Sequence, residues 1–376
     1  MAYKYLYIDD NSEENAIGIL TGLEKEEFLK IDYDNPKGDW EEERDRITSD
    51  NFRQYDGLIL DLNLEEMPNK EQAHSKYKGS TLAQEIRNIS KSGEIKEIPI
   101  ILLSATYNLE KYFDKTNEDL FDLIISREKL GDVYIPTRKK LISLAEGYEL
   151  IGKYKLDFDL SNLMKYDLSS EDIRFIGEID SIRNLPIHSI SNFLIKNLLL
   201  RNGILVSIDL LVTRLGIDKN KSGEIEIVMD KLIPFEYTGV FSNGWRRWWM
   251  SGIESWWNKI LGCELSLRSM KARDRVDFLK GKLNLKELYP IEKAEKSRSE
   301  SFWTNCVGSN IAIDTIDGLL ISNQDNIFPW QDKDYISIDE ALKPIGKQKW
   351  KRISPTQEFK LEQLKKHFPN ERPKQQ

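Results

Sequence analysis

The sequence is poor in the residues that build disulfide frameworks, zinc sites and histidine-based catalytic triads. It has two cysteines, Cys263 and Cys306, and three histidines scattered along 376 residues. The cysteines give neither a disulfide framework nor the short spacing of a metal site. We therefore expect a fold that depends on neither disulfides nor zinc.

Long apolar runs are also missing. No stretch is long enough to span a bilayer, and residues 1–10, MAYKYLYIDD, lack the apolar core of a secretion signal. These absences predict a cytoplasmic protein without membrane contact. No Pro-, Gly- or Ser-rich linker divides the chain, although its length exceeds that of a usual single core and favours two domains.

Charge is unevenly distributed along the chain. Residues 1–150 carry a net charge of −12 and residues 151–376 a net charge of +4, which together give the −8 of the whole sequence. This asymmetry favours two domains with different partners. We place the boundary at residue 150, with an α+β domain and a basic C-terminal tail in residues 151–376.

Residues 1–150 alternate short apolar runs with amphipathic or charged segments. The apolar runs predict strands at residues 4–9, 27–34, 56–62, 98–105 and 122–126. The segments between and after them predict helices at residues 13–25, 38–50, 79–90, 108–117 and 137–150, the first capped by Asn11 or Ser12. Five such alternations predict an α/β doubly wound fold, a parallel sheet covered by helices on both faces.

Polar residues stand where four of the predicted strands end. They are Asp9 and Asp10, Asp61, Ser104, and the pair Ser126-Arg127. Ligands bind beyond the carboxyl ends of the strands in such sheets. Three carboxylates at one edge repel one another unless a cation lies among them, and hard oxygen ligands suit Mg²⁺. In the alternative, each acid caps a helix or lies in a solvated loop.

These residues resemble those of response-regulator receiver domains over about residues 3–150. The matching features are the acidic pair in YLYIDD, the aspartate in LILDLNL, the Ser-Ala pair in IILLSA, and Gly79 before STLAQEIR. The resemblance implies the five-stranded, flavodoxin-like receiver fold. It also implies a role in two-component signalling, with a histidine kinase or a phosphotransfer protein as partner.

The resemblance assigns a role to each matching residue. Asp61 would be the nucleophile that accepts a phosphoryl group. Asp9, Asp10 and Asp61 would hold Mg²⁺ together with the backbone carbonyl of Asn63. Ser104 would donate a hydrogen bond to the new phosphate.

Three features depart from the family pattern. The family has a lysine after strand five, whereas this chain has Arg127 there and Lys129 two residues later, so either cation is a candidate for the phosphate contact. The aromatic residue usual within that strand is replaced by Ile124 or Ile125. The loop at residues 65–78 is also longer than usual. It could cover the site as a lid or contact a partner, although a tolerated surface insertion is the commoner explanation.

The second part of the chain contains an unusual tryptophan-rich segment, FSNGWRRWWMSGIESWW, at residues 241–257. Buried aromatic core, a protein interface, glycan binding and stacking on single-stranded nucleic acid all use such clusters. We favour core or interface. The candidate partner-binding residues are Trp245, Arg246, Arg247, Trp248, Trp249, Trp256 and Trp257.

Two apolar helices are expected at residues 189–203 and 207–217, each closed by a glycine. Read as a helix-turn-helix, the second would be the recognition helix, but it offers only Arg214 to a DNA groove. This argues against DNA binding, and we expect core helices.

Three further segments resemble known sites weakly. Residues 218–230 match the front of an EF-hand loop, but Met229 stands where a bidentate glutamate is required, so we expect a turn that enters a strand. Asp314 and Asp317 offer a nuclease-like acidic pair without its companion residues. Residues 347–376 are expected to form a solvated helix with a fraying tail.

The sequence therefore predicts a signalling protein in which a receiver controls a C-terminal domain that binds a protein partner or a second copy. No independent enzymatic motif is found in that domain. Three alternatives stay open: a degenerate receiver used for docking or dimerisation, a phosphate sink in a multi-protein bacterial or anti-phage system, and a nucleic-acid effector.

Overall fold

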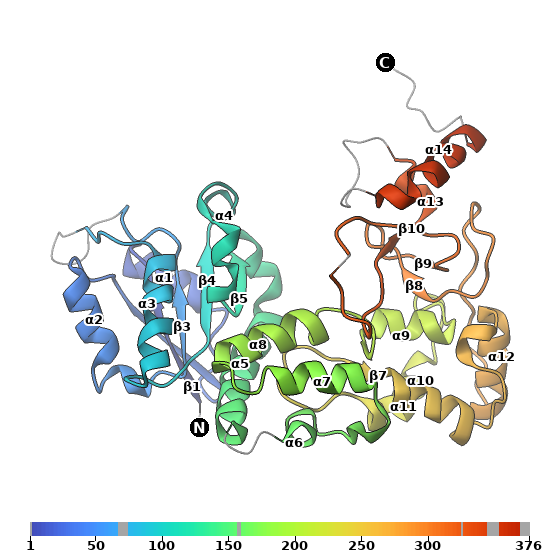
Figure 1. Ribbon diagram of the computed structural model, residues 1–376, viewed down its shortest axis with the longest axis horizontal. Coiled ribbons are helices and arrows are strands. Elements are labelled where there is room, and N and C mark those ends of the chain that lie inside the picture. The colour runs from blue at the N-terminus through green and yellow to red at the C-terminus, as the bar shows by residue number, and fades with distance from the viewer. Residues whose placement is uncertain (1, 67–73, 156–158, 325, 344–352, 369–376) are drawn as a thin grey trace. The chain divides into compact units, whose positions relative to one another are not determined.

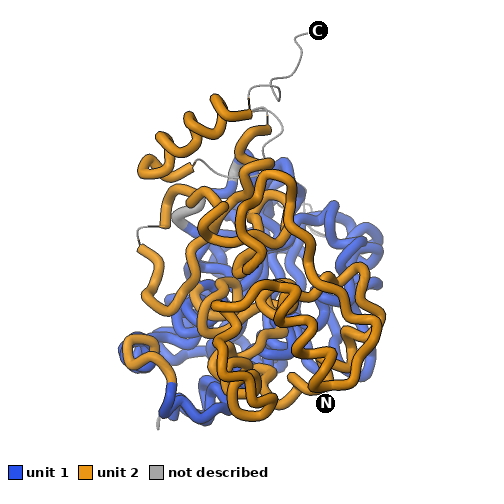
Figure 2. Tube along the Cα trace, turned by 90° about the vertical axis from the view of Figure 1, so that its right-hand side faces the viewer, with its two compact units in different colours: residues 1–170, 176–196, 238–245 blue, residues 171–175, 197–237, 246–376 orange. Residues whose placement is uncertain are grey.

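The computed structural model describes residues 2–66, 74–155, 159–324, 326–343 and 353–368. The chain forms two compact units (Figure 2): unit 1 comprises residues 1–170, 176–196 and 238–245, and unit 2 comprises residues 171–175, 197–237 and 246–376. The boundary expected at residue 150 falls within helix α5 (Tyr134–Tyr154). Unit 1 therefore contains segments that the sequence had placed in the second domain.

Unit 1 is built around a five-stranded parallel sheet (Figure 1). Its strands are β1 (Tyr3–Ile8), β2 (Leu29–Asp34), β3 (Gly57–Leu60), β4 (Ile100–Ser104) and β5 (Leu123–Ser126). They lie in the order β2-β1-β3-β4-β5, and every neighbouring pair is parallel. This is the flavodoxin-like order, so the predicted fold class is confirmed.

Helices connect the strands as the alternation predicted. They are α1 (Glu13–Leu20), α2 (Trp40–Thr48), α3 (Gly79–Ser92), α4 (Thr106–Tyr112) and α5. The Ser12 hydroxyl accepts a hydrogen bond from the backbone N–H of Asn15 and caps α1, while Asp39 caps α2. The sheet and α3 share one apolar core, and β3 and β4 are buried throughout. Burial on both faces explains their continuous apolar sequences.

A buried polar cluster fixes a later helix to this sheet. The Asp122 carboxylate, directly before β5, accepts hydrogen bonds from Arg87 (2.9 Å), from the Tyr148 hydroxyl (2.7 Å) and from Ser191 (2.8 Å). Ser191 belongs to α8 (Ile187–Leu194). Residues of α3, α5 and α8 therefore meet at one carboxylate, which places α8 in unit 1.

Elements outside the receiver-like part are short. The helices are α6 (Leu160–Met164), α7 (Ile173–Ser181), α9 (Ile208–Leu215), α10 (Ile225–Leu232), α11 (Met250–Ser255), α12 (Ala272–Leu283), α13 (Ile338–Ala341) and α14 (Glu358–His367). The antiparallel strand pairs are β6 (Leu205–Val206) with β7 (Trp248–Trp249), β8 (Thr304–Asn305) with β9 (Ala312–Ile313), and β10 (Leu319–Leu320) with β11 (Tyr335–Ile336). Apart from α6 and the greater part of α7, these elements belong to unit 2, which thus mixes helices with small sheets, as expected of an α+β domain.

The strand expected after residue 223 is wrong, because the segment forms helix α10. Val228, Met229 and Leu232 are buried, and the first two lie four and three residues before Leu232, which is a helical spacing. Ile227, whose place in EIEIVM gave the strand-like alternation, is 43% exposed. Burial therefore follows the helical period.

The expected helix at residues 189–203 is also shorter than predicted. Helix α8 continues as a π-helical turn at Ile195–Leu199, and Gly203 lies in an extended bridge with Gln331 instead of capping a helix. Gly216, with φ of +78°, does end α9. Helix α8 belongs to unit 1 and α9 to unit 2.

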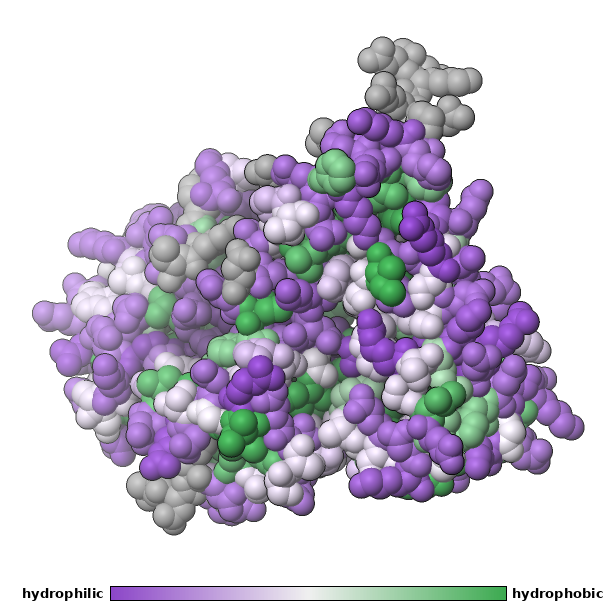
Figure 3. All heavy atoms as spheres, turned by 45° about the vertical axis from the view of Figure 1, so that its right-hand side comes forward, coloured by the Kyte–Doolittle hydropathy of each residue, from purple (hydrophilic) through white to green (hydrophobic). Residues whose placement is uncertain are grey.

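The surface is mixed in character. On the face shown in Figure 3, hydrophilic side chains predominate and apolar residues are scattered among them. Within the part of the chain that the structure describes, every helix is too short or too polar to cross a membrane. Of the predicted C-terminal helix and tail, α14 is seen, and residues 347–352 and 369–376 lie outside the described residues.

Candidate functional site

Three acidic side chains gather at the carboxyl edge of the parallel sheet. Asp9 and Asp10 follow β1 and Asp61 follows β3, two neighbouring strands that run in the same direction. Their carboxylate oxygens lie within 4.8 Å of one another, and the residues are 0%, 6% and 4% exposed. Among the described residues this is the one such group of three metal-ligating side chains.

Asp9 is held in a fixed orientation by its neighbours. One carboxylate oxygen accepts hydrogen bonds from the backbone N–H (3.0 Å) and the side-chain amide (2.8 Å) of Asn11. The hydroxyl of Tyr7 donates to the other oxygen, and Tyr33 donates to the Asp9 backbone carbonyl (3.0 Å). Neither tyrosine was identified from the sequence, because both occupy ordinary strand positions.

The loop after β3 is hydrogen-bonded to the acids. The backbone N–H of Asn63 donates to Asp61 (2.8 Å), and that of Glu66 donates to Asp10 (2.8 Å). The Asn63 side chain reaches the Glu66 carboxylate (2.8 Å). Of the predicted long loop at residues 65–78, residues 67–73 lie outside the described part of the chain.

Gly79 lets α3 begin directly against Asp61. A Cβ atom at this position would lie 2.0 Å from the Asp61 backbone oxygen. The Gly79 N–H donates to the carbonyl of Leu62 (3.0 Å). The absence of a side chain at residue 79 therefore sets the position of the Asp61 backbone.

Arg127 is the cation of the site. One guanidinium nitrogen lies 2.7 Å from Asp9 and 2.9 Å from Asp61. Lys129, the other candidate, is exposed, and no hydrogen bond or ion pair of its side chain is found within the described residues. The structure thus brings Arg127, and not Lys129, to the acids.

Burial and charge shift the protonation of Asp61. Burial, followed by the charge of Asp9, raises the pKa of Asp61 to about 7, although Arg127, Ser104 and the Asn63 N–H oppose the shift. One guanidinium among three carboxylates leaves an excess of negative potential. A bound cation would lower this pKa and keep the carboxylate ionised.

Ser104, the last residue of β4, has a buried hydroxyl beside Asp61. It is 0% exposed, and its oxygen makes no hydrogen bond to a described residue. The hydroxyl is near enough to lower the pKa of Asp61, yet it falls outside hydrogen-bond geometry. The Nε of Arg127 is likewise buried and unpaired. The site thus holds two donors that lack an acceptor.

These residues fit a divalent metal ion. The donor set consists of carboxylate oxygens, which Mg²⁺ and Mn²⁺ prefer over softer ligands. The carboxylates converge and are buried. The unpaired Ser104 hydroxyl lies beside one of the candidate ligands and is available to a further anionic group.

The tryptophan-rich segment lies in the interior. Trp248, Trp256 and Trp257 belong to the apolar core of unit 2, Trp249 packs against Phe175 and Tyr237, and Trp245 is 7% exposed. Arg246 pairs with Glu236, and Arg247 donates to Asn202 (3.1 Å). Burial of all five rings favours the core alternative over a partner-binding surface.

The weaker candidates have structural roles. Asp317 accepts hydrogen bonds from the backbone N–H groups of Arg298 (2.9 Å) and Ser299 (2.8 Å), and Asp314 accepts one from the Ser299 hydroxyl. Asp218 accepts hydrogen bonds from the N–H groups of Asn220 and Lys221, which form a turn. Cys306 is buried and accepts a hydrogen bond from the Ser337 N–H.

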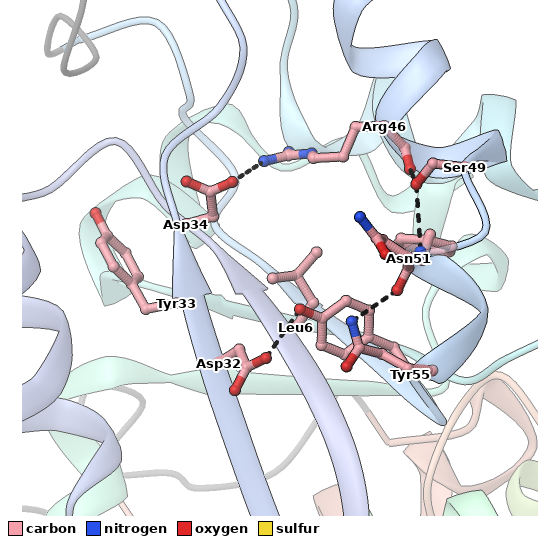
Figure 4. A pocket seen from close by; sticks show the side chains of 10 residues that line it. Leu6, Asp32, Tyr33, Asp34, Arg46, Ser49, Asn51 and Tyr55 are labelled. Carbon is pink, nitrogen blue, oxygen red and sulfur yellow. Dashed lines mark hydrogen bonds and ion pairs between the residues drawn. The ribbon is translucent and has the colours of Figure 1, made fainter.

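A pocket of about 520 Å³ lies beside the edge strand β2 (Figure 4). Its charged and polar groups pair with one another: Arg46 with Asp34 at 3.0 Å, and the Tyr55 hydroxyl with Asp32 at 2.9 Å. These pairings occupy charged groups of the pocket, and we assign the pocket no function.

Comparisons with known proteins identify neither a family nor a named relative. No family model and no curated protein matches the sequence. Solved structures that match part of the chain include three response regulators. They are the phosphorylated cyanobacterial phytochrome response regulator RcpA (20% identity, 40% of this chain and 92% of that one, TM-score 0.25), the Mn²⁺-bound Rcp1 (18%, 39% and 91%, 0.24), and RcsB of Salmonella typhimurium (18%, 50% and 87%, 0.24). At these scores the likenesses establish no function, and the fold class rests on the strand order.

Proposed function

We propose that unit 1 is a receiver that accepts a phosphoryl group on Asp61 in an Mg²⁺-dependent reaction. The supporting observation is the set of groups around Asp61 at one edge of the sheet. They are two further acids, the guanidinium of Arg127 and the buried, unpaired hydroxyl of Ser104. The donor would be a phosphohistidine of a histidine kinase or phosphotransfer protein, or a small phosphodonor.

The reaction is a displacement at phosphorus. An oxygen of Asp61 forms a bond to phosphorus while the bond to the donor's leaving group breaks, and an acyl phosphate results. Asp9, Asp10, Asp61 and the Asn63 backbone carbonyl would hold the Mg²⁺, and when bound it would neutralise charge on the transferring group. Arg127 pairs with the phosphoryl oxygens, and Ser104 donates its hydrogen bond to one of them.

Unit 2 would be the part that responds, through a protein partner or a second copy of the chain. One observation favours a second candidate, an unphosphorylated docking or dimerisation module: Arg127 already forms ion pairs with Asp9 and Asp61. In that case Arg127 would be a structural counter-ion of the two acids, and Asp61 would not be phosphorylated.

Intact mass after incubation with acetyl phosphate and Mg²⁺ tests the proposal. The wild type is expected to gain one phosphoryl group, and Asp61→Asn none. Asp50→Asn is the matched control, because the Asp50 side chain is 93% exposed and forms an ion pair with Arg53 at the surface. Removing Mg²⁺ with EDTA should abolish labelling.

Two results would contradict the proposal. One is an unlabelled wild type under conditions that label a known receiver, which would favour the docking module. The other is equal labelling of Asp61→Asn, which would show that a different residue accepts the group.

A further inference from the structure

A carboxylate joins the loop after β4 to the loop after β5. Glu128 accepts hydrogen bonds from the backbone N–H of Thr106 at 2.9 Å and from its hydroxyl at 2.7 Å. It also accepts one from the Ser126 hydroxyl at 2.9 Å, and the two hydroxyls lie 2.6 Å apart. We call this set of contacts the Thr106–Glu128 clasp.

The carboxylate of the clasp is exposed and ionised at neutral pH. The hydrogen bonds, with that of the Thr106 hydroxyl the largest contributor, lower the pKa of Glu128 to about 2. The carboxylate is therefore ionised, and charge-assisted hydrogen bonds are stronger than neutral ones. Thr106 is the first residue of α4, so the clasp fixes the start of that helix.

Both halves of the clasp are attached to groups that face Asp61. Ser104, with its unpaired buried hydroxyl, stands two residues before Thr106. Arg127, which pairs with Asp9 and Asp61, directly precedes Glu128. One or two peptide units therefore separate these groups from the clasp.

A phosphoryl group on Asp61 would displace both. It carries more negative charge than the carboxylate and extends farther from the backbone, so it draws the Ser104 hydroxyl and the Arg127 guanidinium toward itself. The usual aromatic lever in strand five is absent here, because β5 has the sequence LIIS. A different connection to the surface helices is needed.

We propose that the Thr106–Glu128 clasp transmits the phosphorylation state of Asp61 to helix α4. The inference rests on the proposed receiver function and names the residues through which that function reaches the protein surface. Glu128 acts as a positioning residue: it contacts neither the acids nor the phosphoryl group.

Hydrogen exchange of the segment 105–112 with and without beryllofluoride and Mg²⁺ tests this. Beryllofluoride binds a receiver aspartate as a mimic of the phosphoryl group, and the ¹⁹F resonance of the bound species reports its occupancy independently. In the wild type, exchange in this segment should change by about threefold to tenfold, the range expected for one hydrogen bond. In Glu128→Gln the change should fall to less than twofold at the same occupancy.

Two further variants complete the test. Glu110→Gln is the matched control, because it neutralises an exposed glutamate on α4 outside the clasp, and it should respond like the wild type. Thr106→Val removes the hydroxyl but keeps the backbone N–H, so it should give an intermediate response even where Glu128→Gln folds poorly.

The outcomes distinguish a failure of the proposed clasp from a failure of the proposed receiver function. Bound beryllofluoride with equal exchange responses in the wild type, Glu128→Gln and Thr106→Val would overturn the clasp alone. A wild type that binds no beryllofluoride and takes no phosphoryl group would overturn the receiver function, and the clasp with it.

Discussion

Gly79→Ala should damage the site although residue 79 carries no functional group. The added Cβ would lie 2.0 Å from the Asp61 backbone oxygen and 3.1 Å from its carbonyl carbon. Backbone atoms cannot rotate out of the way, so β3 and α3 must separate by about 1 Å. Overpacking of this kind costs about 1–3 kcal/mol. The gain from alanine reaches about 1 kcal/mol only in a helix interior, and residue 79 is the first residue of α3.

Gly18→Ala is the matched control for this prediction. Residue 18 lies within α1, and a Cβ there would meet nothing within 4 Å. The unfolding free energy of the Gly18→Ala variant should rise by about 0.5–1 kcal/mol, because alanine loses less backbone entropy on folding than glycine. The two Gly→Ala changes are thus expected to have opposite signs.

The unfolding free energy of both variants is measured by urea unfolding, with pulsed hydrogen exchange of the segment 57–64 as the readout. Gly79→Ala should lower the unfolding free energy by about 1–2 kcal/mol. It should also slow labelling of Asp61 by acetyl phosphate by about tenfold to a hundredfold, since a displacement near 1 Å disrupts reactive geometry. Equal stability and equal labelling of Gly79→Ala and the wild type would refute the close approach of Gly79 to Asp61.

Two further predictions concern stability. Asp122→Asn should cost about 3–5 kcal/mol in urea unfolding, because it leaves the buried Arg87 without an ionised partner; Asp50→Asn should cost under about 1 kcal/mol. Burial alone would raise the pKa of Glu97, but hydrogen bonds, that of His188 foremost, lower it from 4.5 to about 2. Because the folded-state pKa is depressed, this stabilisation is present above pH 4.5 and lost toward pH 2. Glu97→Gln should therefore be less stable than the wild type by about 2–3 kcal/mol at pH 7 and equally stable near pH 2; a pH-independent difference would contradict this.

The receiver-like fold could be predicted because local patterns and topology agree. Each strand of the sheet is a short apolar run, and each connecting segment has a helical period or cap. Parallel strands have their carboxyl ends at one edge, so the sequence alone predicted that Asp9, Asp10 and Asp61 would converge. Ser104 and Arg127 were found by the same rule.

The remaining contacts depend on tertiary structure that no local pattern encodes. Glu128 and Thr106 are separated by a strand and a helix along the chain, and only the register of β4 against β5 brings them together. Helix α10 was missed because alternating Ile225 and Ile227 imitate a strand, whereas burial follows the helical period. The composition of residues 241–257 revealed the tryptophan cluster, but only the structure shows that its rings are buried.

The pairing of donors and acceptors favours a receiver over a docking module. A module that keeps Arg127 as a fixed counter-ion gains nothing from burying unpaired donors, and each such donor costs about 1–3 kcal/mol. The described residues leave two at this sheet edge, the Ser104 hydroxyl and the Nε of Arg127. A phosphoryl group on Asp61 would supply acceptor oxygens next to both. Within the described residues, the ion pairs of Arg127 with Asp9 and Asp61 offer these two donors no such acceptor.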